Sequence, residues 1–524
     1  MLSVRKKGLL NLIFSLSYKI VTMLLGIMIP ILFITSYGSE LNGLQSSVQQ
    51  FFSYTMLLEA GVGSATLQSL YAPVRNGDRD KCNAYLAATS KYYNKVGIVY
   101  FIILAILSIG YALIVNVETM VFIEVCVYVL IAGATNGINF FYLAKLKLLI
   151  SAEGDEYIVS ALSMITYILT SVAKIILIYQ GINIIILQVS HFAINMGVTG
   201  IYFAIAKKKY AWLTFKVSPD YTGMKQKNSA LIHQISSLIF QNVDVLLLTF
   251  MCDLEVVSIY TIYKMIINMI TTIIASIGDS VNFIFGREMN NGDESHETYR
   301  TIIDIFNIFY SAIAFGLYVV VFLLILPFMR LYTVDMDINY ILPLLPWLYI
   351  AIEVLTVGRE AMMRTITVAG HFKQTQWRAI AEAVINLGTS IIAVIICKYF
   401  FGEIGGLYGV LIGTIIAMLY RTIDINIYAN KKILKRSSWG SFKVMLTNTV
   451  LFLVVVFLLK PMIPNISDYF QFVLNGIWIT ILVLVVFVVI QALLNIKETK
   501  IVLTYLKQSV NKRAEHNVKD DNEK

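Results

Sequence analysis

The sequence predicts an all-α polytopic membrane protein with 14 transmembrane helices, arranged as two six-helix lobes related by a parallel repeat plus two extra C-terminal helices. Three observations lead to this fold class: the composition, the length of the apolar runs and an internal repeat. Of the 524 residues, 58% are hydrophobic and 14% are charged, whereas soluble proteins have roughly 45–50% and roughly 25%. The mean hydropathy is +0.74 over the whole chain, so we expect no separate soluble domain.

The apolar runs have the length of membrane-spanning helices. A helix needs about 20 mostly apolar residues to cross the hydrocarbon core of a bilayer. Fourteen segments meet that requirement: residues 9–35, 41–70, 88–115, 119–147, 156–180, 184–206, 229–251, 256–285, 300–328, 338–368, 376–398, 404–428, 443–460 and 471–494.

Lysine and arginine are distributed unevenly between alternate connections. With 14 spans and a cytoplasmic N-terminus, 34 of the 41 basic residues fall in or beside the inner connections, three fall in the outer ones, and four lie inside spans. This asymmetry follows the positive-inside rule. It predicts a multi-pass protein of the cytoplasmic (inner) cell membrane with both termini in the cytoplasm. The net charge of +9 therefore reports topology, and we expect no nucleic-acid partner.

An internal repeat divides the chain. Asn76-Gly77-Asp78 follows the second span and Asn291-Gly292-Asp293 follows the eighth, at an offset of 215 residues that also carries Glu40 onto Glu255. Because six spans per copy is an even number, both copies enter the membrane in the same sense, as in parallel-repeat transporters that bind substrate between their halves. The predicted parts are an N-terminal lobe (1–210), a C-terminal lobe (211–437), helices 13 and 14 (438–496) and a solvated, disordered cytoplasmic tail (497–524).

Ionisable side chains inside the spans are the candidate functional residues, because each charge near the bilayer centre costs at least about 2.5–3.5 kcal/mol. Lys19 and Glu59 lie at matching depth on the first two spans, and Asp244 and Lys264 do so on the seventh and eighth. We expect Lys19 to pair with Glu59, and Asp244 with Lys264, beside a hydrated cavity. Arg359 in the tenth span is a fifth candidate for that cavity. The alternative, that such pairs only lock neighbouring helices together, stays open.

Other charged residues in the spans have an oppositely charged residue nearby on the same helix or can reach the membrane surface. Three pairs are spaced three or four residues apart on one helix: Glu360 with Arg364, Arg378 with Glu382, and Arg421 with Asp424. We expect them to stabilise their own helices. Lys174 is about six residues from an outer helix end, so its side chain can extend to the membrane surface.

Motifs for catalysis and cofactor binding are missing from the sequence. It contains no Walker lysine motif, no G-x-S-x-G and no H-E-x-x-H. The four cysteines are spread singly along the chain, without metal-ligand spacing. We therefore expect a protein that is not an enzyme, has no catalytic residues, and needs no cofactor or metal.

Three stretches near the N-terminus resemble a known family. They are Ser36-Tyr37-Gly38-Ser39-Glu40-Leu41-Asn42-Gly43-Leu44, then Glu59-Ala60-Gly61-Val62-Gly63, then Leu70-Tyr71-Ala72-Pro73 with Asn76-Gly77-Asp78. They resemble the opening of bacterial polysaccharide-unit exporters, the O-antigen and capsule flippases of the MATE-like (multidrug/oligosaccharidyl-lipid/polysaccharide) exporter superfamily. Residues 244–260 also look like the seventh and eighth helices of that family.

The resemblance implies a function and partners. It implies translocation of undecaprenyl-pyrophosphate-linked oligosaccharide repeat units for surface polysaccharide biosynthesis, by alternating access through a central cationic cavity. The implied partners are this lipid-linked substrate and membrane lipid, with the glycosyltransferases and polymerase of the same pathway as candidates. Basic residues on helices 1 and 8 line the cavity in relatives, and Lys19 and Lys264 lie on the corresponding helices here. A lysine ammonium is a compact counter-charge for a pyrophosphate.

Competing functions remain at this point. A lipid II flippase shares the fourteen spans, while an ion-coupled multidrug exporter of the same fold usually has twelve. A polytopic glycosyltransferase or polymerase, from another class, usually needs a substantial external loop. The longest predicted outer connections here are short, around 330–339 and 461–470.

Helices 13 and 14 fall outside the repeat, and their cores, Val444–Leu459 and Phe472–Leu494, contain no charged residue. A polyprenyl tail has to stay in hydrocarbon while its head crosses a polar cavity, because each buried CH₂ contributes about 0.8 kcal/mol. We expect these two helices to pack against the second copy and to form an apolar groove that continues the cavity.

Overall fold

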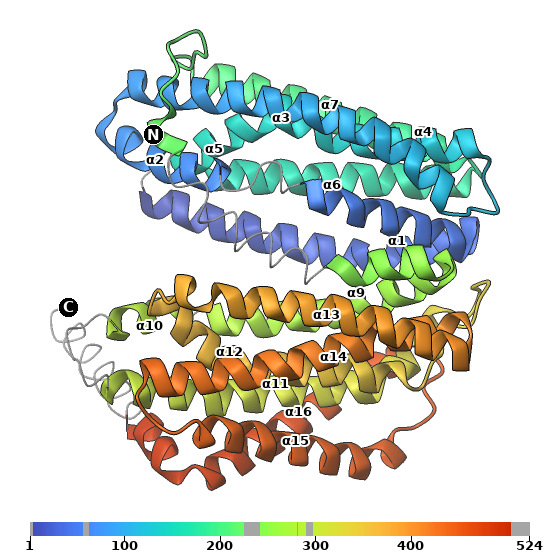
Figure 1. The fold of residues 1–524 in the computed structure, drawn as a ribbon, viewed down its shortest axis with the longest axis vertical. Coiled ribbons are helices and arrows are strands. Elements are labelled where there is room, and N and C mark those ends of the chain that lie inside the picture. Colours follow the sequence, from blue (N-terminus) through green and yellow to red (C-terminus); the bar gives the residue numbers. More distant parts are fainter. Residues whose placement is uncertain (1–3, 56–61, 225–241, 280, 290–296, 505–524) are drawn as a thin grey trace, which may run out of the picture. The chain divides into compact units, whose positions relative to one another are not determined.

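The computed structural model describes residues 4–55, 62–224, 242–279, 281–289 and 297–504. Helices dominate these ranges, and no strand occurs within them. The predicted all-α class is therefore confirmed. The contacts divide the chain into two compact units, which we describe separately (Figure 1). Unit 1 comprises Met1–Ile262, Asp335–Asn339 and Lys398–Leu407; unit 2 comprises Tyr263–Val334, Tyr340–Cys397 and Tyr408–Lys524.

Long helices make up unit 1. They are α1 (Val4–Thr55), α2 (Val62–Asn76), α3 (Arg79–Ile114), α4 (Phe122–Ile138), α5 (Ala144–Ala152), α6 (Glu156–Tyr179) and α7 (Ile184–Lys209). A π-helical turn, η2 (Asn139–Leu143), joins α4 to α5, and a 3-10 turn, η3 (Tyr221–Met224), follows α7. A short apolar helix covers Asn242–Met251, and α9 (Leu254–Asp279) starts in this unit and continues into unit 2.

Unit 2 continues with the remaining helices. They are α10 (Asn282–Met289), α11 (Glu297–Tyr332), α12 (Leu345–Val368), α13 (Phe372–Phe401), α14 (Glu403–Tyr428), α15 (Trp439–Leu459) and α16 (Tyr469–Leu494). A π-helical turn, η4 (Ala429–Ile433), follows α14, and a 3-10 turn, η5 (Lys460–Met462), follows α15. The end of α13 and the start of α14 lie in unit 1.

Eleven helices of the described residues are long and apolar enough to cross a membrane. The predicted first span and residues 41–55 of the second lie in one of them, because α1 runs through the expected break, while residues 62–70 belong to α2. Most of the predicted seventh span lies outside the described residues. The predicted tenth span is α12, which carries four charged side chains and is not among the eleven. The count of fourteen crossings stays a prediction.

The break predicted between the first two spans is a bend inside α1. Gly38 has φ of +87°, a conformation that favours glycine, and is the non-helical residue within α1. Beyond it the backbone amide of Ser39 donates to Asp337 Oδ2 at 2.7 Å. Asp337 thus caps the second segment of α1 from a distant part of unit 1, where a carboxylate is favoured by the helix dipole.

The predicted thirteenth and fourteenth helices, α15 and α16, both pack against α11, and α15 also packs against α12 (Figure 1). Ile479, Val483 and Phe487 of α16 are fully buried at four-residue spacing. Leu484 and Phe487 lie against Gly316 of α11. The expected packing against the second copy is therefore confirmed.

Candidate functional site

Lys19 lies on the exposed side of α1, next to the exposed apolar residues Leu16 and Ile20. Its carbonyl accepts a hydrogen bond from Thr22 at 2.9 Å. Within the described ranges its ammonium makes no ion pair. Glu59, the predicted partner, lies outside the described residues, so the Lys19–Glu59 pair stays a prediction.

Asp244 is 6% exposed in the short helix before α9. The hydroxyl of Tyr260 donates to Asp244 Oδ2 at 2.9 Å, which stabilises the buried carboxylate. Lys264 follows one turn after Tyr260 on α9 but belongs to unit 2, where its charge interacts with that of Glu353 on α12. The Asp244–Lys264 pair therefore also stays a prediction.

Glu353 joins three helices of unit 2. The hydroxyl of Tyr318 on α11 donates to Glu353 Oε2 at 2.7 Å, and it lies 3.0 Å from the hydroxyl of Thr271 on α9. Together with the charge of Lys264, these contacts surround the carboxylate with polar groups from α9 and α11.

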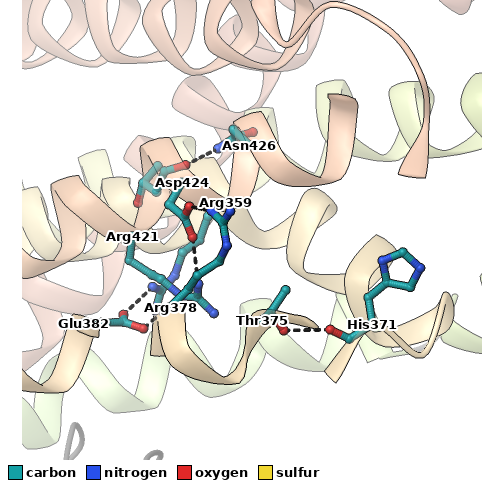
Figure 2. A network of polar contacts seen from close by, with 9 residues as sticks. Arg359, His371, Thr375, Arg378, Glu382, Arg421, Asp424 and Asn426 are labelled. Carbon is teal, nitrogen blue, oxygen red and sulfur yellow. Dashed lines mark hydrogen bonds and ion pairs between the residues drawn. The ribbon is translucent and has the colours of Figure 1, made fainter. Parts of the chain in front are cut away.

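Arg359, the fifth predicted site residue, belongs to a charge network formed by α12, α13 and α14 (Figure 2). Arg359 contacts Glu382 Oε1 at 2.6 Å, and Arg421 Nε contacts Glu382 Oε2 at 3.0 Å. Arg421 also contacts Asp424 Oδ2 at 3.0 Å. Arg378 forms an ion pair with the other oxygen of Asp424. Each carboxylate is thus shared by two guanidinium groups.

The network is largely removed from solvent. Arg421 is 3% exposed and Glu382 is 8% exposed. Buried charges are tolerated when they are paired and hydrogen-bonded, and removing one partner is strongly unfavourable. The three arginines outnumber the two carboxylates by one charge, and the least buried of them, Arg378, lies with its guanidinium 5.0 Å from the Tyr428 ring. This geometry suits a network that holds three helices together.

The expected same-helix pairs are partly correct. Glu360–Arg364, at 2.7 Å, and Arg421–Asp424, at 3.0 Å, are confirmed. The Arg378–Glu382 pair is wrong, because each residue finds its partners on other helices. A sequence shows spacing along one helix but not which neighbouring helix brings a second charge.

Hydrogen bonds from α14 hold α12 in place beside the network. Thr422 Oγ1 donates to the carbonyl of Leu355, and Asn426 Nδ2 donates to the carbonyl of Gly358, both at 3.0 Å. Gly358 immediately precedes Arg359, so these bonds fix the backbone from which Arg359 projects. Figure 2 shows Asn426 at one side of the network, with His371 and Thr375 farther away, near the start of α13.

Lys174 was not among the predicted site residues. It lies half-buried on α6, with its ammonium 3.4 Å from Gln45 Oε1 of α1. His191 of α7 is close enough for its charge to interact with that of Lys174. The side chain thus reaches into a contact with α1 and α7, whereas the sequence led us to expect an extension to the membrane surface. Among the residues that the structure describes, no carboxylate lies within ion-pair distance of it.

The fold that carries these charged residues is similar to those of known structures. The chain is similar to "Lipid II flippase MurJ, inward closed conformation", with a TM-score of 0.66 and 16% identity over 93% of this chain and 100% of that chain. The chain has the fold of MATE-like exporters. It is also similar to an inward-facing "multidrug resistance MATE family transporter of the MOP superfamily", with a TM-score of 0.60 and 16% identity over 83% of this chain and 99% of that chain.

A third similar structure, of the MATE multidrug transporter DinF-BH, has a TM-score of 0.53 and 13% identity over 82% of this chain and 97% of that chain. No family model and no curated protein sequence matches the chain. The sequence resemblance to the MATE-like superfamily is therefore confirmed as a shared fold.

Proposed function

We propose that this MATE-like chain is a flippase that translocates undecaprenyl-pyrophosphate-linked oligosaccharide repeat units across the cytoplasmic membrane by alternating access. Surface polysaccharide biosynthesis is the process it would serve. Its role would be transport, with no covalent step.

The observation that carries the proposal is Lys19, whose exposed side chain lies on a helix long enough to span the membrane. A lysine at such a place needs water or an anion, because a bare ammonium in hydrocarbon costs several kcal/mol. A pyrophosphate head group supplies that anion during transport. Lys264 would be its counterpart in unit 2, balanced by Glu353 while no substrate is bound.

The apolar helices α15 and α16 support a substrate with a lipid tail. Both pack against α11, and they present exposed apolar residues such as Leu453 and Ile481. A surface of this kind can hold polyprenyl chains, since each buried CH₂ contributes about 0.8 kcal/mol. We propose that it forms the apolar groove expected from the sequence.

Flipping in proteoliposomes tests the role of Lys19. Lipid-linked oligosaccharide is placed in the vesicles, and the fraction that becomes accessible to a membrane-impermeant reagent is measured over time. Lys19→Ala should lower the rate at least about tenfold, because a hydrogen bond to a charged group contributes roughly 1.5–3 kcal/mol. Lys207→Ala, which removes an exposed lysine from the end of α7, is the matched control. An unchanged rate in Lys19→Ala would contradict the proposal.

Lipid II is a second candidate substrate, because a structure similar to this chain is named as a lipid II flippase. Its head group carries the same pyrophosphate, so Lys19 cannot separate the two. Parallel assays with lipid II and with an undecaprenyl-pyrophosphate-linked oligosaccharide lacking the peptide decide between them. Faster flipping of lipid II would replace the polysaccharide proposal with the cell-wall one.

The groove has its own test. Leu453→Arg places a charge on the exposed side of α15, and Leu453→Phe is the apolar control. The arginine variant should fold yet lose flipping of lipid-linked substrate, while the phenylalanine variant keeps it. Equal flipping by both variants would remove the groove from the proposed pathway.

A further inference from the structure

Three polar side chains of unit 1 lie at matching depth on three helices. Lys174 is five residues before the end of α6, His191 is seven residues after the start of α7, and Gln45 is six residues into the second segment of α1. At 1.5 Å per residue, each lies roughly 8–11 Å along its helix from the same end. These helices pack side by side, α1 against α6 and α6 against α7.

Lys174 contacts one of the other two side chains and interacts electrostatically with the second. Lys174 Nζ is 3.4 Å from Gln45 Oε1, a long contact for a charged donor. His191 is close enough for electrostatic interaction with Lys174. Within the described residues, Lys174 thus contacts one amide oxygen and interacts electrostatically with one imidazole.

Four other lysines of unit 1 have shorter polar contacts than Lys174. Lys7 and Lys209 form ion pairs with Asp155, and Lys398 forms one with Glu403. Lys145 donates to the Ser90 hydroxyl at 2.9 Å and has the Phe215 ring 4.9 Å from its ammonium. Lys174 is half-buried inside a membrane-spanning helix, and no carboxylate neutralises it within the described part of the chain. Within the residues that the structure describes, this ammonium therefore has no counter-anion.

We infer that Lys174, Gln45 and His191 form an anion subsite that takes a diphosphate group. Lys174 supplies the charge, while the Gln45 amide and a neutral imidazole can each donate a hydrogen bond. This subsite rests on the proposed function and adds a second binding position for the diphosphate, besides Lys19. Lys19 lies on the first segment of α1, and Gln45 lies on the second, beyond the bend at Gly38. The diphosphate would meet one cation on each side of that bend.

Binding of inorganic pyrophosphate to the purified full-length protein tests the subsite without transport. Lys174→Met keeps the aliphatic stem and removes the charge, so it should weaken pyrophosphate binding about tenfold or more, measured by calorimetry and by thermal stabilisation. Lys174→Arg should bind within about threefold of wild type, because it keeps the charge. Lys207→Gln, a loss of the same charge at an exposed site, should bind like wild type.

A second variant guards against a folding defect in Lys174→Met. Gln45→Leu leaves the charge in place and removes one donor, so it should weaken binding by a smaller factor, about threefold. Wild-type affinity in both Lys174→Met and Gln45→Leu would overturn the subsite.

A further arm separates free diphosphate from a lipid head group. The same variants are titrated with undecaprenyl pyrophosphate in nanodiscs, and the subsite predicts the same order of affinities for both probes. If only the free anion responds to Lys174→Met, the subsite is not part of a lipid pathway and this inference fails. If the flipping assay shows no oligosaccharide transport but both probes depend on Lys174, the subsite stands and the proposed substrate fails.

Discussion

Unit 1 and unit 2 differ in whether their intramembrane cations have a carboxylate beside them. In unit 1, Lys19 and Lys174 have no carboxylate within ion-pair distance among the described residues. In unit 2, Arg359 and Arg421 share Glu382, and Arg421 also shares Asp424 with Arg378. Pairing cancels charge and fixes geometry, whereas an unpaired lysine keeps its capacity for an anion. We therefore propose that the two lysines of unit 1 bind an anion and that the arginines of unit 2 hold helices in position.

Unit 1 also forms ion pairs with lysines, but at the ends of its spans. At the turn between α5 and α6, Asp155 is 1% exposed and contacts Lys7 at 2.9 Å and Lys209 at 2.7 Å. The hydroxyl of Tyr210 donates to the same carboxylate at 2.9 Å. This cluster ties the start of α1 to the end of α7. The two units therefore differ in where along their helices the ion pairs lie, as well as in whether the intramembrane cations are paired.

Removing the central carboxylate of unit 2 should have the largest effect on stability. Glu382→Gln leaves Arg359 and the buried Arg421 with one neutral neighbour in place of a shared charge. Loss of one partner from a buried ion pair costs roughly 3–5 kcal/mol, so the thermal unfolding midpoint should fall by many degrees. Thermal unfolding in detergent measures this. A change below about 1 kcal/mol would show that the network is not what holds the three helices.

Asp155 should make stability in unit 1 depend on pH. Burial alone would raise its pKa, but hydrogen bonds from Lys209, Lys7 and Tyr210 outweigh burial and hold the pKa below its ordinary value. A depressed carboxylate pKa stabilises the folded state above the unfolded value of about 3.9, and that contribution is lost as the pH falls through the folded value.

The Asp155→Asn variant tests this sign. It should be less stable than wild type at pH 7, by roughly 1.5–3 kcal/mol for the hydrogen bonds to a charged group, and the difference should shrink below about pH 4. Unfolding midpoints of both proteins across this range give the answer. A difference that grows toward acid would contradict the assignment.

The sequence predicted the features that are determined within a single helix. Apolar run length predicted most helices, and spacing predicted Glu360–Arg364 and Arg421–Asp424, because partners one turn apart must meet. The break expected between the first two spans is a bend at Gly38 inside α1.

What failed or was missed depends on which helices are neighbours. Glu382 pairs with arginines of α12 and α14, which spacing along α13 could not show. Lys174 lies beside Gln45, 129 residues away in sequence. The signal that could have found it was that Lys174 lies inside a span with no acidic residue within one turn on α6.

The smallest effect on stability is expected for Arg378, at the solvent-exposed edge of the charge network in unit 2. Arg378 pairs with Asp424, but its side chain is 42% exposed and also lies over the Tyr428 ring. A partly exposed ion pair contributes about 0–1 kcal/mol, because solvent screens it. Arg378→Gln should therefore lower the unfolding midpoint only slightly, and Asp424 would keep Arg421 as its partner. If Arg378→Gln destabilised the protein as much as Glu382→Gln, the exposure of a side chain would not predict how much it contributes to stability. Arg378 would then contribute as much as the buried Arg421–Glu382 pair.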